Sequence, residues 1–433
     1  MSNSYLYFYL YLAAFVIAVT LYLNRQRRKH VAHATQLQYA VESGLMEPPS
    51  LHPVVDTTRC FGGGACVKSC PEHALGVVDG KAVLINAAHC IGHGACLAAC
   101  PVEAIKLVFG TEKRGIDIPS VTPHFETNVP GIFIAGELGG MGLIRKAAEQ
   151  GRQAVNSLRK KVSGKGDFDV VIVGCGPAGL SAGLAAMEHK LRYKLVEQED
   201  SLGGSVYHYP RQKIAMTAPV DLAIVGKVKF NEVQKEKLLE FWQDIVKKTG
   251  LKISFRERME GIDREEEHFV VRTNRGKYTA STVLLSMGRR GTPRKLDVPG
   301  EDTHKVVYRL IDPAQYRGQA VLVVGGGDSA LEAAIALSEE AGTDVTLSYR
   351  SAAFSRVKQK NRMLLEQQEK AGRIKVMLNS QTTRVTETHV EIDFEGIPQR
   401  LRNDAVIVCA GGLLPTPLLQ SIGIEFATKH GKE

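Results

Sequence analysis

At 433 residues the chain is too long for a single domain, and two or three domains are expected. The formal net charge is +9, but no long basic run with interleaved aromatic residues is present, which argues against a nucleic-acid-binding protein. The positive balance suits a membrane surface or an acidic redox partner better.

The first stretch with a clear physical signature is 5–23, which carries no charged residue. Its length is close to the ~20 residues that cross a bilayer, and tyrosines lie toward both ends, as at membrane interfaces. Four basic residues follow at once: Arg25, Arg27, Arg28 and Lys29. Because no positive charge precedes the stretch, the layout is the reverse of a signal peptide. We expect a transmembrane anchor over 1–24, with its N-terminus outside and all later domains in the cytoplasm. The alternative is a buried helix of a soluble protein.

After a predicted stalk over 25–53, six of the eight cysteines form two strings of identical spacing, each followed by proline. The strings are Cys60, Cys66 and Cys70, then Cys90, Cys96 and Cys100. Thiolate sulfur is the ligand that iron–sulfur clusters require. We expect an iron–sulfur domain over 54–110, with a hairpin between the strings that turns at Asp79-Gly80.

These strings resemble the bacterial dicluster ferredoxin, whose unit is C-x2-C-x2-C-x3-C-P. The second cysteine of each unit is replaced, by Gly63 in the first string and by His93 in the second. In that family the last cysteine of each unit binds the other cluster. The resemblance therefore implies two ligand groups: Cys60, Cys66 and Cys100, and Cys70, Cys90 and Cys96. His93 is either a ligand of the second group or a bystander. Three thiolates suit a three-iron cluster, or a four-iron cluster with one open or non-cysteine corner. The alternative is a ferredoxin fold that has lost its metal.

A dinucleotide fingerprint follows, with Gly174, Gly176 and Gly179 between a buried strand and a helix that opens at Pro177-Ala178. The first glycine allows the turn, the second lets the backbone approach a pyrophosphate, and the third allows close packing of helix on strand. Glu197 ends the next strand, where a carboxylate binds ribose hydroxyls.

A second fingerprint contains Gly325, Gly327 and Ala330. Its second strand ends in Tyr349-Arg350 rather than in an acid, and further basic residues follow: Arg356, Lys358 and Lys360. Arginine accommodates a 2′-phosphate, which an acid would repel, so NADPH is expected rather than NADH. The alternative is that these charges simply belong to a solvated loop.

Two fingerprints in one chain are similar to thioredoxin-reductase-like and ferredoxin–NADP-reductase-like flavoproteins, and Gly203-Gly204 resembles the loop on their flavin side. In that family the chain ends with a strand, a turn and a helix that close the FAD domain. Here the matching segment, with Gly136-Glu137 in place of glycine-aspartate, comes before the first fingerprint. The resemblance thus implies a circularly permuted FAD domain, whose helix begins near Met141.

The expected fold class is α/β, with two Rossmann-like domains, a small α+β dicluster domain and one transmembrane helix. The displaced part of the FAD domain occupies 111–163, and its main part 167–295. The NAD(P)H domain spans 296–410, and 411–433 returns to the FAD domain.

The expected function is electron transfer between NADPH, FAD and the clusters, to or from a ferredoxin-like or membrane-bound partner. A homodimer is compatible with the sequence. Outside the strings only Cys175 and Cys409 remain, far apart and without a C-x-x-C neighbour, which disfavours a thiol–disulfide role. The alternatives are a flavin-dependent NADPH dehydrogenase or disulfide reductase with non-catalytic clusters, and a membrane-tethered redox sensor.

Overall fold

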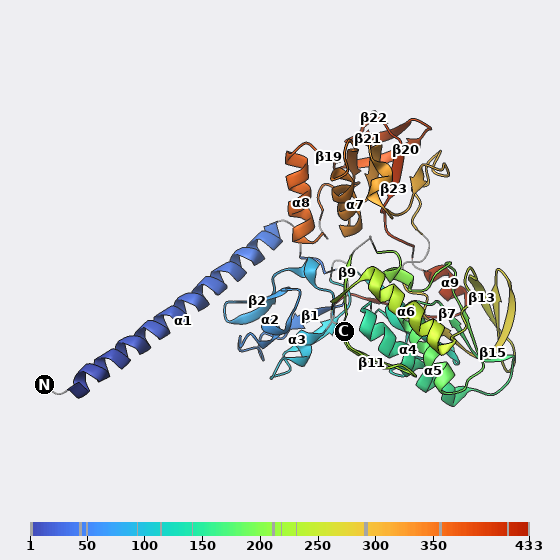
Figure 1. Ribbon diagram of the computed structural model, residues 1–433, viewed down its shortest axis with the longest axis horizontal. Coiled ribbons are helices and arrows are strands. Elements are labelled where there is room, and N and C mark those ends of the chain that lie inside the picture. Colours follow the sequence, from blue (N-terminus) through green and yellow to red (C-terminus); the bar gives the residue numbers. More distant parts are fainter. Residues whose placement is uncertain are drawn as a thin grey trace. The chain divides into compact units, whose positions relative to one another are not determined.

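The computed structural model describes residues 3–42, 46–48, 51–92, 94–112, 115–140, 142–209, 213–217, 219–230, 232–289, 293–354, 357–413 and 415–431 (Figure 1). The chain divides into two compact units. The first contains Met1–Arg114, Ser355–Gln359 and His430–Glu433, and the second contains Gly115–Phe354 and Lys360–Lys429.

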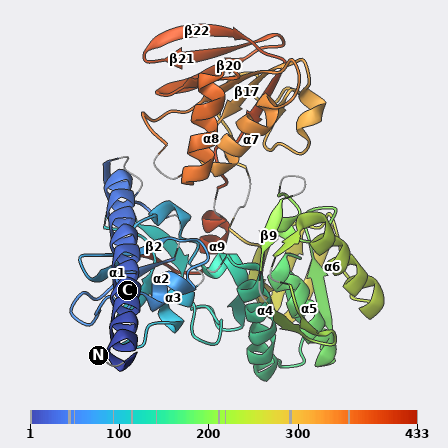
Figure 2. The same cartoon turned by 60° about the vertical axis from the view of Figure 1, so that its left-hand side comes forward.

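The first unit opens with a single long helix, α1 (Asn3–Glu42), which neither proline nor glycine interrupts (Figure 2). Its stretch from Tyr7 onward is long and apolar enough to cross a bilayer. The large apolar side chains of that stretch are exposed, with Tyr11 at 76% and Phe15 at 67%. The second half of α1 is polar and packs on the following module through β2.

That module is a small α+β fold built around the two cysteine strings. Two antiparallel pairs form it, β1 (His52–Val55) with β4 (Ile105–Val108), and β2 (Leu75–Val78) with β3 (Lys81–Leu84). Short helices α2 (Ala65–Ser69) and α3 (Ala95–Ala98) follow a left-handed glycine in each string. The predicted hairpin is confirmed: Asp79 and Gly80 both have positive φ, as a tight two-residue turn requires.

The second unit is organised around two sheets, the first of them six-stranded. Its main path runs β13 (Met259–Arg264), β14 (Phe269–Thr273), β15 (Gly276–Leu285), β7 (Phe168–Val173) and β8 (Tyr193–Val196). Helix α5 (Pro177–Glu188) connects β7 to β8, and α6 (Lys235–Thr249) contributes Trp242 to the same core. Three short strand pairs complete this part, formed by β9 (Ile214–Met216) with β12 (Glu232–Gln234), β10 (Val220–Leu222) with β11 (Gly226–Val228), and β5 (Ile116–Pro119) with β24 (Phe426–Lys429).

The sixth strand of this sheet comes from the segment that precedes β7 in the chain. Strand β6 (Ile132–Ile134) pairs in parallel with β15, and its three side chains are fully buried. Helix α4 (Ile144–Leu158) packs so closely on α5 that a methyl group at Gly151 would overlap the carbonyl oxygen of Ala178. The helix thus begins at Ile144, three residues after the predicted start at Met141, which lies outside the described residues.

The second sheet is parallel and five-stranded. Its order is β16 (Val306–Val307), β23 (Ala405–Val408), β17 (Ala320–Val324), β18 (Asp344–Ser348) and β19 (Ile374–Met377). Helices α7 (Asp328–Ser338) and α8 (Gln359–Lys370) belong to this part, as does an antiparallel sheet of β20 (Ser380–Val385), β21 (His389–Phe394) and β22 (Ile397–Arg402). A short α9 (Thr416–Ser421) then packs in the core of the first sheet.

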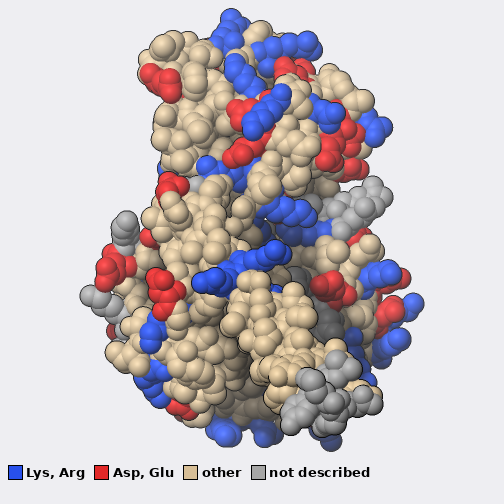
Figure 3. All heavy atoms as spheres, turned by 90° about the vertical axis from the view of Figure 1, so that its left-hand side faces the viewer, with Lys and Arg blue, Asp and Glu red and all other residues tan. Residues whose placement is uncertain are grey.

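Charge is distributed rather than gathered on the face seen in Figure 3, where basic and acidic side chains are interspersed. The net charge of +9 therefore forms no single basic field over that face.

Candidate cofactor sites

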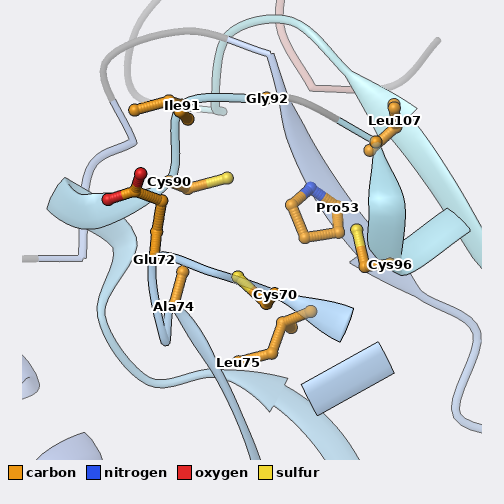
Figure 4. A pocket seen from close by; sticks show the side chains of 11 residues that line it. Pro53, Cys70, Glu72, Ala74, Leu75, Cys90, Ile91, Gly92, Cys96 and Leu107 are labelled. Atoms are coloured by element: carbon orange, nitrogen blue, oxygen red, sulfur yellow. The ribbon is translucent and has the colours of Figure 1, made fainter. Parts of the chain in front are cut away.

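Three cysteines from the two strings line one pocket in the first unit. Cys70 comes from the first string, and Cys90 and Cys96 from the second; their sulfur atoms turn toward the same space (Figure 4). Apolar groups such as Pro53 and Leu107 complete the wall of this pocket. We call these three cysteines cluster site two.

The other three cysteines, Cys60, Cys66 and Cys100, form cluster site one. Cys60 and Cys66 are buried and Cys100 is half-buried, and all three pack in one hydrophobic cluster that also contains Cys96 of cluster site two. Two backbone amides point at their sulfur atoms: that of Ala82 donates to Cys60 Sγ over 3.4 Å, and that of Ala104 to Cys100 Sγ over 3.3 Å. Amide donors to cysteine sulfur are a usual feature of iron–sulfur sites.

The chemistry of these donors fits iron. Burial raises the pKa of the Cys66 and Cys96 thiols, and raises that of Cys90 to about 11. Thiolates in such surroundings need a positive charge beside them, which a bound metal supplies. Among the described residues, no three cysteine, histidine or carboxylate side chains are placed to hold a metal ion. The grouping therefore rests on the shared pocket and on the donor chemistry.

The two positions without cysteine differ. Gly63 is exposed, and the atoms nearest to a methyl group there belong to the ring of Phe61, which would have to shift. His93 lies outside the described residues, although its neighbours Gly92 and Gly94 line the pocket of cluster site two.

In the second unit, the first glycine fingerprint forms the turn between β7 and α5. Gly174 has φ +97°, and a side chain there would collide with the backbone of Ser286 and Met287. A methyl group at Gly179 would overlap the carbonyl oxygen of Gly174, whereas the nearest atom to one at Gly176 is 3.8 Å away. The second glycine therefore leaves room beside the backbone, as a pyrophosphate requires.

Glu197 lies at the end of β8, where the sequence predicted a ribose-binding carboxylate. It is 5% exposed, and its two carboxylate oxygens accept hydrogen bonds from the amides of Cys175 (2.6 Å) and Glu199 (3.0 Å). Burial raises its pKa despite those two donors. The carboxylate thus holds the backbone of the glycine loop in place, and its oxygens keep further lone pairs that can accept hydrogen bonds from a ligand.

The other predicted flavin-side residues lie beside this loop. A methyl group at Gly136 would approach Ala178 of the loop to 2.9 Å, and one at Gly204 would approach Gly176 to 3.1 Å. The amide of Gly203 donates to the carbonyl of Cys175. The fold therefore brings the displaced segment and both glycine pairs to one place.

Glu137 faces groups that the sequence did not single out. Ser205 Oγ donates to Glu137 Oε2 over 3.4 Å. Burial lowers the pKa of the Arg289 guanidinium, and the nearby charge of Glu137 opposes that lowering. Arg289 also donates a hydrogen bond to the carbonyl oxygen of Asp117 over 3.1 Å. Ser205 adjoins the Gly203-Gly204 pair, whereas no sequence signal marked Arg289.

The second glycine fingerprint lies between β17 and α7. Gly325 has φ +148°, Gly327 caps α7, and Ala330 is fully buried beneath the turn. The ring of Tyr349 packs against Gly326 and stacks on Phe354 with the ring centres 5.4 Å apart. An aromatic ring thus stands beside this loop, where Glu197 stands beside the first.

The predicted phosphate-binding residues are only partly described. Arg350 is exposed directly after Tyr349, and Lys360 is exposed near the start of α8. Lys358 is half-buried, and Arg356 lies outside the described residues.

Of the two remaining cysteines, Cys175 is buried and Cys409 is half-buried. Burial raises the pKa of Cys175 strongly and that of Cys409 to about 12. Neither has the lowered pKa of a redox-active cysteine.

Two dinucleotide folds in one unit, together with a module that carries two cysteine strings in the same chain, define an iron–sulfur flavoprotein of the nucleotide-dependent oxidoreductase class. The family model for pyridine nucleotide-disulphide oxidoreductases matches 171–432, more than half of the chain, and the chain belongs to that family. A model for the 4Fe-4S dicluster domain matches 52–101.

Individual relatives agree. The chain is 30% identical over 213 residues to a ferredoxin–NADP reductase of Ignicoccus hospitalis, covering 49% of this chain and 64% of that protein. It is 31% identical over 255 residues to one from Thermus thermophilus, covering 56% and 72%. The bacillithiol disulfide reductase Bdr of Staphylococcus aureus has a similar fold, with a TM-score of 0.53, 25% identity, and coverage of 61% of this chain and 85% of that one. The chain thus spans under two thirds of the first of these relatives.

The two family matches support FAD, NADPH and iron–sulfur clusters as the cofactors. Two glycine loops with room for a pyrophosphate and six cysteines in two groups agree with that assignment.

Proposed function

We propose that this chain is a membrane-anchored NADPH oxidoreductase that moves electrons between NADPH, FAD and two iron–sulfur clusters, to or from a ferredoxin-like or membrane-held partner. The observation that carries the proposal is the pairing of two nucleotide loops with two cysteine triads in one chain. When bound, FAD would take a hydride from NADPH and release electrons singly.

The residues have distinct roles in this proposal. Gly174, Gly176 and Gly179 would admit the pyrophosphate of FAD, and Glu197 would hold its ribose. Gly136-Glu137 would meet the ribitol side. Gly325, Gly327 and Ala330 would bind the NADPH pyrophosphate, with Arg350 and Arg356 at the 2′-phosphate. The cysteines of cluster site one and cluster site two would be the metal ligands, and His93 would occupy the open corner of cluster site two.

The exposed apolar half of α1 supports an anchor in the cytoplasmic membrane. The basic residues Arg25, Arg27, Arg28 and Lys29 follow that half directly, so the positive-inside rule favours a cytoplasmic location for both units.

The test is an anaerobic NADPH titration of the purified protein, followed by visible and EPR spectra. We expect the flavin absorbance to bleach while reduced-cluster signals grow. Iron that stays silent while flavin is reduced would mean that electrons enter through the clusters instead. Absence of iron after anaerobic purification would contradict the proposal.

A disulfide reductase is the second candidate, favoured by the similarity to Bdr. The burial and raised pKa values of Cys175 and Cys409 count against it. A membrane-tethered redox sensor is a third, and it predicts cofactor binding with negligible turnover.

A further inference from the structure

Helix α1 is continuous, but its two halves differ in what they contact. The large apolar side chains of its first half are exposed, as with Leu21 at 65%, so no other described part of the chain covers them. Its second half presents His33, Gln36, Leu37 and Ala40 at the i, i+3, i+4 and i+7 positions of one face, and these are among its better-buried residues. A docked cytoplasmic half and a bare apolar half therefore share one continuous backbone.

The docking contacts are specific. The amide of Val77 donates to His33 Nδ1 over 3.1 Å, and Gln36 Nε2 donates to Asn86 Oδ1 over 2.8 Å. Gly76 is needed at the contact because a methyl group there would lie 2.9 Å from His33 Cγ and 2.8 Å from Ile85 Cδ1. The iron–sulfur module is thus fixed to the helix that carries the apolar stretch.

These contacts also give the module a direction. Along α1, His33 meets Val77, and three residues farther from the apolar half Gln36 meets Asn86. Val77 lies next to the turn of the β2–β3 hairpin, whereas Asn86 lies beyond its open end. The hairpin turn at Asp79-Gly80 therefore points along α1 toward the apolar half.

Cluster site one belongs to that turn. Lys81 Nζ donates to the carbonyl of Cys60 over 2.6 Å, and the amide of Ala82 donates to Cys60 Sγ. A methyl group at Gly62 would overlap the carbonyl oxygen of Gly80. Cluster site two lies nearer the open end of the hairpin, where Cys70 and Cys90 pack with Ala74, which directly precedes β2.

From this geometry we propose that cluster site one is the terminal redox site, which exchanges electrons with an integral-membrane redox protein. The proposal rests on the membrane anchoring and electron-transfer function proposed above. His33 follows Leu23 by ten residues, so it lies roughly 15 Å along the helix from the end of the apolar stretch. The hairpin turn and cluster site one lie on the bilayer side of that position.

The loop that covers cluster site one suits a protein partner. Phe61 is 64% exposed at its tip, and three glycines follow without side chains to separate a partner from the buried sulfur of Cys66. An exposed aromatic beside a thin backbone cover is an arrangement that allows close approach of a second protein.

The placement is tested in liposomes with dithionite-reduced protein and lipids whose headgroups carry a dysprosium chelate. Paramagnetic headgroups should enhance the EPR relaxation of cluster site one more than that of cluster site two. The variant Gly63→Cys identifies the signal of cluster site one by changing it alone. Equal enhancement, or greater enhancement of cluster site two, would overturn the proposal.

An insertion in α1 tests whether the distance between the module and the bilayer sets the enhancement. Seven residues inserted after Lys29 should raise the module by about 10.5 Å with little rotation, and should weaken the enhancement. Gly76→Leu should release the module from the helix, and Ala34→Leu on the exposed face is its matched control. Mixed with membranes that contain the partner, the insertion and Gly76→Leu should slow electron exchange while NADPH still reduces the flavin in detergent, whereas Ala34→Leu should exchange electrons at the wild-type rate.

Partner outcomes are also separable. The wild-type protein is also tested with a purified quinone in protein-free vesicles. Electron exchange as fast as with membranes that contain the partner would mean that the partner is a lipid-soluble molecule, and would overturn this assignment. A titration in which NADPH fails to reduce the flavin would instead contradict the proposed function and leave the relaxation result standing.

Discussion

At the scale of single residues, Glu197 shows how one carboxylate serves both the fold and the site. Its two oxygens accept hydrogen bonds from the amides of Cys175 and Glu199, so the glycine loop is fixed in place without a ligand. Because the group is buried, removing one acceptor leaves an amide without a partner.

We expect Glu197→Gln to weaken FAD binding roughly ten- to a hundredfold, because a hydrogen bond to a charged group contributes about 1.5–3 kcal/mol. Titration of the flavin-free protein with FAD, followed by flavin fluorescence, measures this. Asp200→Asn on the exposed side of the same turn is the control. Equal affinities of Glu197→Gln and wild type would show that the carboxylate is not part of the site.

Gly63 offers a second test at this scale. We expect Gly63→Cys to complete a four-cysteine set at cluster site one, since the atoms nearest the added Cβ belong to the exposed Phe61 ring, which can shift aside. Iron content per protein and the EPR spectrum of the reduced protein would report the change. A spectrum identical to wild type would mean that the open corner lies elsewhere.

At the scale of elements, a buried carboxylate ties β14, β15 and β8 together. Burial alone would raise the pKa of Glu257, but hydrogen bonds from Tyr278 (2.6 Å) and Thr273 (2.8 Å) and the ammonium of Lys194 (3.3 Å) lower it. A carboxyl whose pKa is lower in the folded state stabilises the fold above its unfolded pKa of about 4.3. That contribution disappears as pH falls through the folded pKa.

Tyr278→Phe should therefore lower the free energy of unfolding by about 1–3 kcal/mol at pH 7, with the deficit shrinking below pH 4. Urea unfolding followed by the fluorescence of Trp242, the single tryptophan of the chain, measures both. A deficit that does not change with pH would mean that the carboxylate is not involved.

Much at the element scale was predictable, because each glycine fingerprint is a local pattern of strand, loop and helix. The hairpin at Asp79-Gly80 was predictable for the same reason. The stalk over 25–53 was predicted, but its docking was not, because polar His33 and Gln36 interrupt the docking face and leave no continuous apolar stripe. The packing of Tyr349 on Gly326 likewise depends on a contact between two separate turns.

At the scale of the whole molecule, the glycine fingerprints and the cysteine strings lie in separate units. We expect the double variant Cys66→Ser, Cys96→Ser to keep NADPH-dependent flavin reduction while losing transfer to the physiological acceptor. Stopped-flow absorbance for the flavin and acceptor assays with the same preparation measure the two steps. Unchanged acceptor turnover would favour a flavoenzyme with inert clusters.

The placement of β6 ahead of β7 has a consequence for biosynthesis. Ile132, Phe133 and Ile134 leave the ribosome before their partner β15 exists, and about 150 residues separate the two strands. At about 5–20 residues per second, this apolar edge stays without its partner for roughly 8–30 s. Strand β5 waits longer still, for β24. Nascent chains of this protein should therefore depend on chaperones that shield strand edges, while the iron–sulfur module, made of local contacts, can fold first.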